Sequence, residues 1–363
     1  MITTVGERIK EARLMAGLSL RDLADRVGVS AQAISKYERG LDKPGSGVLL
    51  RLAKALGVRV EYFVRPKSDI VLQPVFRKRA ALPRRKEEAA LARVREWLER
   101  YLEIETLTRR QVPFTYPEGF PFAIGQLPDT ETAAEALRKA WQVGVDPIEN
   151  LTKLLEDHGI KVGAVDAHHK FDACAFWLGP EKQTPVIALK ESLPGDRQRM
   201  NLAHELGHLL LKPGPGVDEE RMAFRFAGAF VVPRQAAVAE IGDRRHTFTP
   251  YELHLLKHKY GLSMQAWIYR AKDLGILTDA DALALFKAFK AQGWHVKEPG
   301  DPYPPERSER LEQLVMHAWS EGAISESRAT ELLGMSFKDF QREVKRDHGG
   351  IPIAVRLGHH AAG

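Results

Sequence analysis

Residues 204–208 read His204-Glu205-Leu206-Gly207-His208, inside a segment from Arg197 onward whose apolar spacing is that of a helix. Positions four residues apart lie about 40° apart around a helix axis, so both imidazoles project to one side and can bind one cation. Glu205, beside the first histidine, can reach a metal-bound water rather than the metal, as a general base must. The stretch therefore predicts a hydrolytic metal centre carried on a helix.

Chance is a weak explanation for this string. A chain of 363 residues with 13 His and 48 acidic residues is expected to contain about 0.06 His-acid-x-x-His strings. The single cysteine, Cys174, excludes an internal disulfide and a cysteine-rich zinc site, so a metal must be held by His, Asp or Glu. Asp196 is expected to cap the helix. Its buried face is expected to consist of leucines: Leu202, Leu206, Leu209 and Leu210.

A catalytic zinc site needs a third protein ligand and an open position for water. The next predicted helix, residues 218–230, begins with Asp218, Glu219 and Glu220. We choose Glu220, because it shares a stripe with Ala223 and Ala227, whose small side chains permit close approach to the histidine helix. The alternative is an acidic first turn with no ligand role, since the helix dipole alone favours acids there.

The sequence around this centre predicts mixed α and β structure from residue 108. Two helices are expected at 130–143 and 148–158. Strands are expected at 160–165 and 173–178, which would pair, and a third short apolar run at 185–189 has strand length. Residues 251–260 and 263–274 predict a helix pair, and further helices are expected at 306–321, 325–333 and 336–344.

The stretch from about Glu131 to Pro233 resembles the ImmA/IrrE family of metallopeptidases. The resemblance rests on these strings: Glu135-Ala136-Leu137-Arg138-Lys139-Ala140-Trp141, Pro147-Ile148, Leu155-Glu156-Asp157-His158-Gly159-Ile160, Arg199-Met200-Asn201-Leu202-Ala203-His204-Glu205-Leu206-Gly207-His208 and Glu220-Arg221-Met222-Ala223-Phe224-Arg225-Phe226-Ala227. It implies a zincin-like fold and peptide hydrolysis. His204, His208 and Glu220 would hold zinc, with manganese as an alternative, and Glu205 would act as base.

The chain departs from that family pattern at two points. Phe224 stands where many relatives have asparagine, and the gap from His208 to Glu220 is short. The family implies a substrate-side subdomain after the protease core, which the helix pair at 251–274 resembles. A transition-state donor is left open among His168, His169, His246 and Tyr251.

The N-terminal 64 residues predict five short helices with almost no strand signal. Glycines and serines at the boundaries stop and cap helices at 5–16, 20–27, 31–38 and 46–56, with a last turn around 61–64. The glycine turn between the second and third helices, Val27-Gly28-Val29-Ser30, and the polar first turn after it resemble the XRE/Cro-type helix-turn-helix family over residues 5–64.

In that family the second helix of the motif enters the major groove. Gln32 and Lys36 would then meet base edges, Ala31 would offer an apolar contact, and Ser35 would face outward. Phosphates would be held by four residues: Arg21, Ser30, Arg39 and Lys43. A small helical domain that binds only protein is the alternative.

The positive charge of the chain is concentrated at its N-terminal end. Residues 1–64 carry 11 Lys and Arg against 7 Asp and Glu, a net charge of +4, and residues 65–86 carry 8 against 1, a net charge of +7. Because the whole chain has a net charge of +6, residues 87–363 carry a net charge of −5. This excess fits a polyanionic partner. The Pro- and Arg-rich residues 65–86 predict a linker with one strand at 70–76, and the alternating charges of residues 87–107 predict an exposed connecting helix.

These observations predict an α+β protein in four parts. They are a five-helix DNA-binding domain (1–66), a basic linker and connecting helix (67–107), a zincin-like metallopeptidase domain with a small sheet (108–278) and a C-terminal helical domain (279–363). With no apolar run long enough to span a bilayer and no export signal, we expect a cytoplasmic protein without a membrane partner.

The expected function is a DNA-binding transcriptional regulator whose zinc endopeptidase cleaves a repressor or antitoxin through metal-activated water. Its partners would be the protein substrate and a double-stranded DNA operator. The protein would bind the symmetric half-sites of this operator as a homodimer. Self-cleavage within residues 65–90 is a further expectation, since linkers are preferred nicking sites. One alternative is a non-catalytic repressor or antitoxin whose metal site stabilises or senses. Another is a toxin-neutralising partner acting by contact alone.

Overall fold

The computed structural model describes residues 5–65, 70, 72, 83–179 and 183–345. Most of the predicted arm, with its strand at 70–76 and its expected cleavage stretch, lies outside the described residues. Within them, the protein is a helix-rich α+β molecule with two small sheets. No helix in these described ranges is both long and apolar enough to cross a membrane.

The N-terminal head consists of α1 (Val5–Met15), α2 (Leu20–Val27), α3 (Ala31–Glu38) and α4 (Ser46–Leu56), followed by the 3₁₀ helix η1 (Val60–Val64). The fifth predicted helix is therefore a 3₁₀ turn. Ser19 and Ser30 cap α2 and α3 by accepting the backbone N–H groups of Asp22 and Ala33. The head encloses its own hydrophobic core around Ile9, Leu23 and Ile34.

Helix α5 (Arg84–Thr108) is packed between the head and the sheet, and the prediction of an exposed connecting helix is wrong. Most of its charged residues lie at exposed or half-buried positions, although Glu99 and Glu105 are buried, and one face is apolar and buried. Val94, Trp97 and Tyr101 on this face pack against strand residues such as Phe176 and Val186. The 3.6-residue spacing of the apolar positions, rather than the charge pattern, decides where this helix lies.

The main sheet has three strands: β2 (Lys161–Val165), β3 (Ala173–Leu178) and β4 (Thr184–Lys190), in the order β2-β4-β3. Strand β4 pairs with β2 in parallel and with β3 antiparallel. The predicted pairing of the first two strands is therefore wrong. Residues 185–189 are buried on both faces of β4, so the third and most apolar strand takes the centre.

A second sheet joins β1 (Phe122–Ile124) to β5 (Leu211–Pro213) in parallel. Each strand has three residues, which is too few for an alternating pattern to be visible in the sequence.

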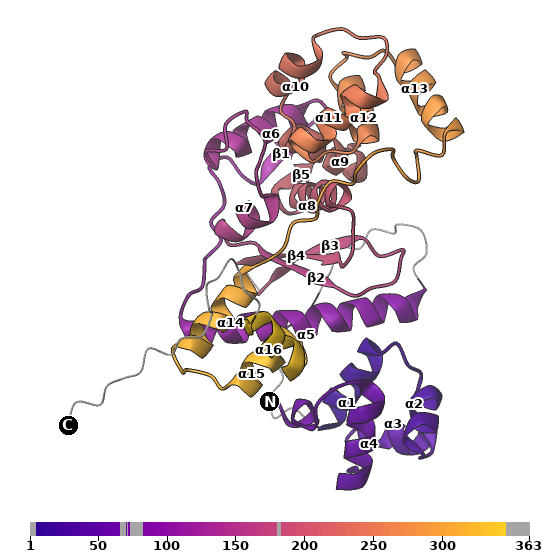
Figure 1. Ribbon diagram of the computed structural model, residues 1–363, viewed down its shortest axis with the longest axis vertical. Helices are drawn as coiled ribbons and strands as arrows, with labels where there is room; N and C mark the ends of the chain where they lie inside the picture. Colours follow the sequence, from indigo (N-terminus) through magenta and orange to yellow (C-terminus); the bar gives the residue numbers. More distant parts are fainter. Residues whose placement is uncertain (1–4, 66–69, 71, 73–82, 180–182, 346–363) are drawn as a thin grey trace, which may run out of the picture.

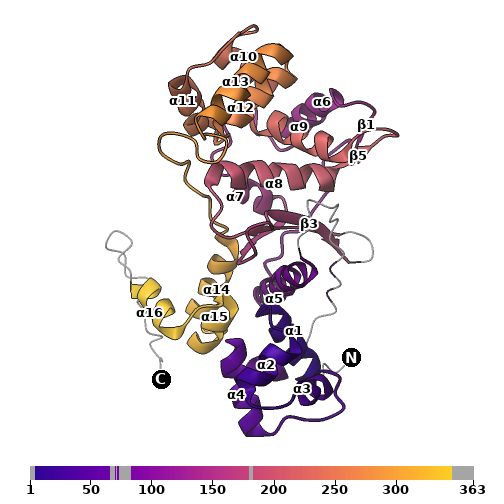
Figure 2. The same cartoon turned by 90° about the vertical axis from the view of Figure 1, so that its right-hand side faces the viewer.

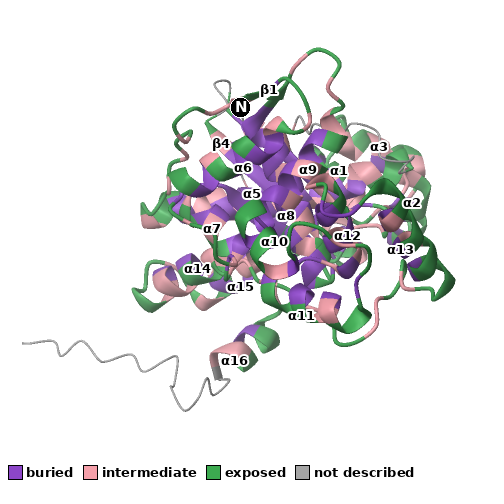
Figure 3. Ribbon diagram, turned by 90° about the horizontal axis from the view of Figure 1, so that it is seen from above, coloured by how far each residue is buried: buried purple, intermediate pink, exposed green. Residues whose placement is uncertain are grey.

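The histidine helix α8 (Gly195–Leu210) and α5 lie on opposite sides of the main sheet (Figure 1). Around α8 are α6 (Asp129–Ala140), α7 (Leu151–Asp157) and α9 (Glu219–Val231), which share its hydrophobic core. Seen from above, buried residues are concentrated on α5, α6, α8 and α9, and exposed ones on outer helices such as α2 (Figure 3). Helix α8 begins at Gly195 after Pro194, so the expected cap Asp196 lies inside the first turn, where it pairs with Lys257 at 3.0 Å.

The remaining helices form two groups. Helices α10 (Arg234–Ile241), α11 (Pro250–Tyr260), α12 (Met264–Asp273) and α13 (Asp279–Ala291) extend the core around α8. Residues 292–309, which we call the strap, run back along the molecule to α14 (Arg310–Ser320), α15 (Glu326–Leu333) and α16 (Phe337–Lys345) (Figure 2). Helices α14–α16 pack around Ile104 of α5, so the segment predicted as one C-terminal domain contributes to two separate cores.

Candidate metal centre

Two helices, α8 and α9, bring the candidate ligands together. His204 and His208 occupy one face of α8, and Glu220 lies in the first turn of α9. Gly207 makes the close crossing possible, because a Cβ atom there would lie 3.3 Å from the Cα atom of Ala223. Ala223 and Ala227 are fully buried, as their stripe of small side chains predicts.

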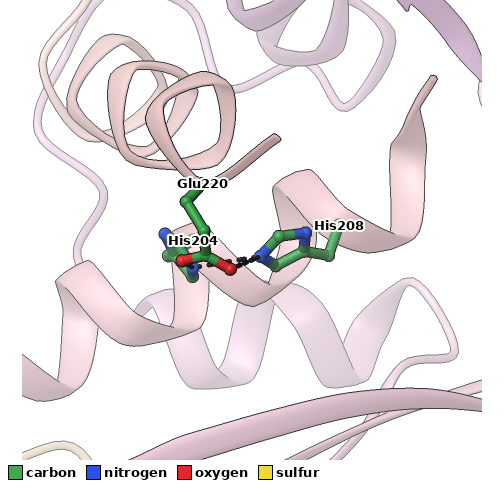
Figure 4. A group of neighbouring side chains, drawn as sticks. All are labelled: His204, His208 and Glu220. Carbon is green, nitrogen blue, oxygen red and sulfur yellow. Dashed lines mark hydrogen bonds and ion pairs between the residues drawn. The ribbon is translucent and has the colours of Figure 1, made fainter. Parts of the chain in front are cut away.

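The three side chains converge on one point (Figure 4). Their ligating atoms all lie within 4.8 Å of one another. The Nε2 atoms of His204 and His208 are 3.1 Å apart, and each lies 3.5 Å from an oxygen of Glu220. The histidine side chains are only 3% and 9% exposed, whereas Glu220 is 38% exposed, so the centre opens to solvent on the carboxylate side.

The other two acids of this turn have different contacts. The Asp218 carboxylate accepts the backbone N–H of Arg221 at 2.9 Å and caps α9. Glu219 Oε1 lies 3.3 Å from His208 Nδ1, the ring nitrogen that faces away from the centre. A carboxylate in this position fixes the tautomer and orientation of a ligating imidazole. The sequence pattern does not indicate this role for Glu219.

Glu205, the expected base, is half-buried on α8 and is not one of the three clustered side chains within the described residues. Its carboxylate acts electrostatically on Cys174 of β3. Burial, with Glu205 as the second cause, raises the pKa of the Cys174 thiol. Glu205 is therefore close enough to β3 for its charge to act on this thiol.

Phe224, one turn beyond Glu220 on α9, borders the centre. Its ring is 40% exposed, and its centroid lies 4.2 Å from that of the His204 ring. An apolar surface therefore lies directly beside one candidate ligand.

The residues considered as transition-state donors have other neighbours. The rings of His168 and His169 pack on each other with centroids 4.0 Å apart, and His246 Nδ1 lies 3.4 Å from Asp281. Tyr251 is 72% exposed on α11. None of these contacts involves the three clustered side chains.

The predicted DNA-contacting residues lie on the head around α2 and α3. Six of them are exposed: Arg21, Ser30, Gln32, Lys36, Arg39 and Lys43. Ala31 and Ser35 are half-buried on α3. The Ser30 hydroxyl already accepts the Ala33 N–H at 3.1 Å, and this cap leaves the hydroxyl proton available to a phosphate.

Comparisons with known proteins divide the chain in the same way. Residues 9–63 match the helix-turn-helix family model, and residues 155–272 match the model of the IrrE N-terminal-like domain, Peptidase_M78. The chain therefore carries an XRE-type helix-turn-helix segment at its N-terminus and an IrrE/ImmA-like domain after it, which confirms both resemblances.

Similar curated proteins match the head. An uncharacterized transcriptional regulator in the ATPase CF(0) region of Rhodospirillum rubrum is 44% identical over 59 residues, which are 16% of this chain and 55% of that protein. The HTH-type transcriptional regulator y4wC of Sinorhizobium fredii is 39% identical over 59 residues, 16% of this chain and 41% of that one. The chain thus spans about half of these relatives or less. The solved structure of ComR from Streptococcus suis aligns over 92% of this chain and 88% of its own, with 11% identity and a TM-score of 0.17, which carries no argument about the fold.

Proposed function

We propose that this chain is a DNA-binding transcriptional regulator whose second domain is a zinc-dependent endopeptidase that cleaves a regulatory protein, such as a repressor or an antitoxin. The observation that carries the proposal is the convergence of His204, His208 and Glu220 within 4.8 Å. The head supplies the regulatory half of the proposal through its helix-turn-helix segment.

The donor set suits zinc in a catalytic site. Two imidazole nitrogens and one carboxylate oxygen are a recurring protein ligand set for catalytic zinc, with one position left for water or substrate. When bound, zinc supplies Lewis acidity and lowers the pKa of water toward neutrality. Manganese is the alternative metal. The contact of Glu219 with His208 Nδ1 supports the same assignment, since ligating histidines are held by such partners.

The protein residues then have separate roles. His204, His208 and Glu220 hold the metal, and Glu219 orients His208. Glu205 accepts a proton from the attacking water as the water oxygen adds to the peptide carbonyl carbon, and later delivers it to the leaving amine.

A peptide is the favoured substrate class because of the strand beside α8. Strand β3 is an outer strand of the three-stranded sheet, and the charge of Glu205 acts on Cys174 of this strand. Extended peptides bind to outer strands through main-chain hydrogen bonds.

For the head, we propose binding to a double-stranded operator as a homodimer in the cytoplasm. Gln32 and Lys36 would contact base edges, and Arg21, Ser30, Arg39 and Lys43 would contact phosphates. The exposure of all six side chains supports these roles. Ala31 would offer its methyl group to the groove, and Ser35 a hydroxyl.

One observation favours a second candidate, a regulator that uses the metal for structure or sensing without hydrolysis. Phe224 borders the centre, and a phenyl ring offers no hydrogen-bond donor to a developing oxyanion.

A zinc assay followed by a cleavage assay separates the two candidates. His204→Ala and Glu220→Ala should lose stoichiometric zinc, whereas Glu205→Gln should retain it. The wild type should then cut a candidate substrate, first the product of the adjacent gene, and Glu205→Gln should leave it intact. Stoichiometric zinc together with equal inactivity of wild type and Glu205→Gln on every candidate would favour the sensing role.

A further inference from the structure

The position of α5 against the head has a consequence for DNA binding. Three ion pairs join α1 and α2 to α5: Arg8–Glu99 at 2.7 Å, Glu11–Arg95 at 3.5 Å and Asp22–Arg85 at 2.5 Å. From the first pair to the third, the residue numbers in the head increase while those in α5 decrease. Helix α5 therefore runs antiparallel to α1, and its N-terminal end reaches the start of α2.

The first of these pairs fixes the register. Arg8 and Glu99 are buried, with side chains 1% and 6% exposed. Arg8 also pairs with Glu11, and Glu99 with Arg65, so a buried network of charges holds α5 in this register, and sliding α5 along the head would separate these charges from their partners. The N-terminal end of α5 is thereby held beside α2 (Figure 1).

The first turn of α5 is basic and open to solvent. Arg84, Arg85 and Lys86 are all exposed, and the Arg84 side chain is 92% exposed. The acids that face them are Glu88, 3.0 Å from Arg84, and Asp22, which pairs with Arg85. Both pairs are exposed and therefore weak, so they leave the arginines available to a stronger anionic partner.

The neighbouring helix α2 is the part of a helix-turn-helix motif that crosses the DNA backbone, while the following helix enters the major groove. Asp22, the residue that Arg85 contacts, directly follows Arg21, a proposed phosphate contact. Basic groups beside this helix thus lie next to the path of the phosphates.

We propose that Arg84, Arg85 and Lys86 form a second DNA-binding surface, which contacts phosphates flanking the site read by α3. This surface, which we call the α5 basic turn, belongs to the segment that links the two domains rather than to the helix-turn-helix unit itself. It rests on the proposed function, because it presupposes that the head binds duplex DNA. The phosphates that it contacts continue the backbone that α2 crosses.

The salt dependence of binding tests this surface without knowledge of the operator, since phosphate contacts are independent of sequence. Each lost contact reduces the slope of log K against log salt by about 0.9, and weakens binding at 0.15 M salt by about fivefold. The probe is a 40-base-pair duplex of random sequence, titrated with the full chain. We expect the triple variant Arg84→Ala, Arg85→Ala, Lys86→Ala to lose about 2.7 units of slope and to bind about 125-fold more weakly.

A matched triple variant controls for the change in net charge. Arg234, Lys287 and Lys290 are exposed on α10 and α13, at the opposite end of the molecule from the head. Replacing all three with alanine removes the same charge and should leave the slope unchanged. Circular dichroism melting of both variants checks that the fold is kept, as expected for exposed positions.

The outcomes distinguish this inference from the function on which it rests. A wild type that binds no duplex would overturn DNA binding, and the α5 basic turn with it. A wild type that binds while both triple variants keep its slope would overturn the α5 basic turn alone. Equal losses in the two variants would also overturn it, because they would reflect net charge rather than position.

Discussion

At the scale of single residues, the candidate centre depends on a carboxylate outside the ligand set. Glu219 lies 3.3 Å from His208 Nδ1. We expect Glu219→Ala to bind zinc about 10- to 100-fold more weakly, because His208 loses the partner that orients it. Competition with a chromogenic chelator measures the affinity. The zinc affinity of Glu219→Gln, which keeps a hydrogen-bond acceptor, should fall between those of wild type and Glu219→Ala. A zinc affinity of Glu219→Ala equal to that of wild type would contradict the role.

The sequence identifies the two histidines and Glu220 because helical spacing alone puts them on suitable faces. Glu219 could not be found in this way. Its contact depends on how residues 211–218 turn from α8 into α9, and the same acid is equally expected in a first turn for its interaction with the helix dipole.

At the scale of elements, the strap holds the start of α8 in place. Glu306 pairs with the fully buried Arg199 and accepts the backbone N–H groups of Leu151 and Thr152 at 3.1 and 2.7 Å. Glu306→Ala should lower the free energy of unfolding by about 3–5 kcal/mol, because it leaves a buried guanidinium without its charged partner. Urea denaturation measures this. Glu309→Ala, at an exposed position of the same segment, should change it by less than about 0.5 kcal/mol, and equal losses would contradict the assignment.

A second contact of the strap is sensitive to pH. Ser308 Oγ lies 2.7 Å from Glu156 Oε1 and 2.9 Å from the Val162 carbonyl oxygen. One hydroxyl proton cannot serve both acceptors, but a protonated Glu156 can donate to Ser308 while Ser308 donates to Val162. In agreement, burial raises the pKa of Glu156 from its ordinary 4.5 to about 7.

The sign of the effect follows from this shift. Between pH 4.5 and 7 the folded protein binds more protons at Glu156 than the unfolded chain, so its contribution to the free energy of unfolding falls as pH rises. The loss amounts to at most about 3 kcal/mol and is complete above pH 7. Urea denaturation at pH 5 and pH 8 should show Glu156→Gln to be less sensitive to pH than wild type. If the exposed-site control Glu312→Gln shows the same reduction, the effect does not arise from Glu156.

Helix boundaries were predictable where local signals are strong. Helices α2 and α3 begin after the serine caps Ser19 and Ser30, and α2 and α4 end at Gly28 and Gly57, as these residues indicate. Strand order was not predictable, because the pairing of β4 between β2 and β3 depends on contacts across the sheet. The alternating charges of α5 favour an exposed helix although its apolar spacing fits a buried one, and α10 and α13 lie outside the predicted helices.

At the scale of the whole molecule, the head and the metal centre are joined by a continuous stack. Helix α8 lies on one side of the main sheet, α5 on the other, and α1 packs along α5 (Figure 2). The head is therefore docked on the body rather than carried on a free arm. Self-cleavage within residues 65–90 stays a prediction, since most of that segment lies outside the described residues.

The measurement that tests the central claim most directly is the appearance of new peptide termini. Zinc-loaded wild type and zinc-loaded Glu205→Gln are each incubated with one library of proteome-derived peptides, and the products are read by mass spectrometry. The account predicts paired products whose masses sum to a parent peptide plus one water, present with wild type and absent with Glu205→Gln at equal zinc content. Intact peptides with fully loaded wild type, or equal cleavage by both proteins, would contradict it.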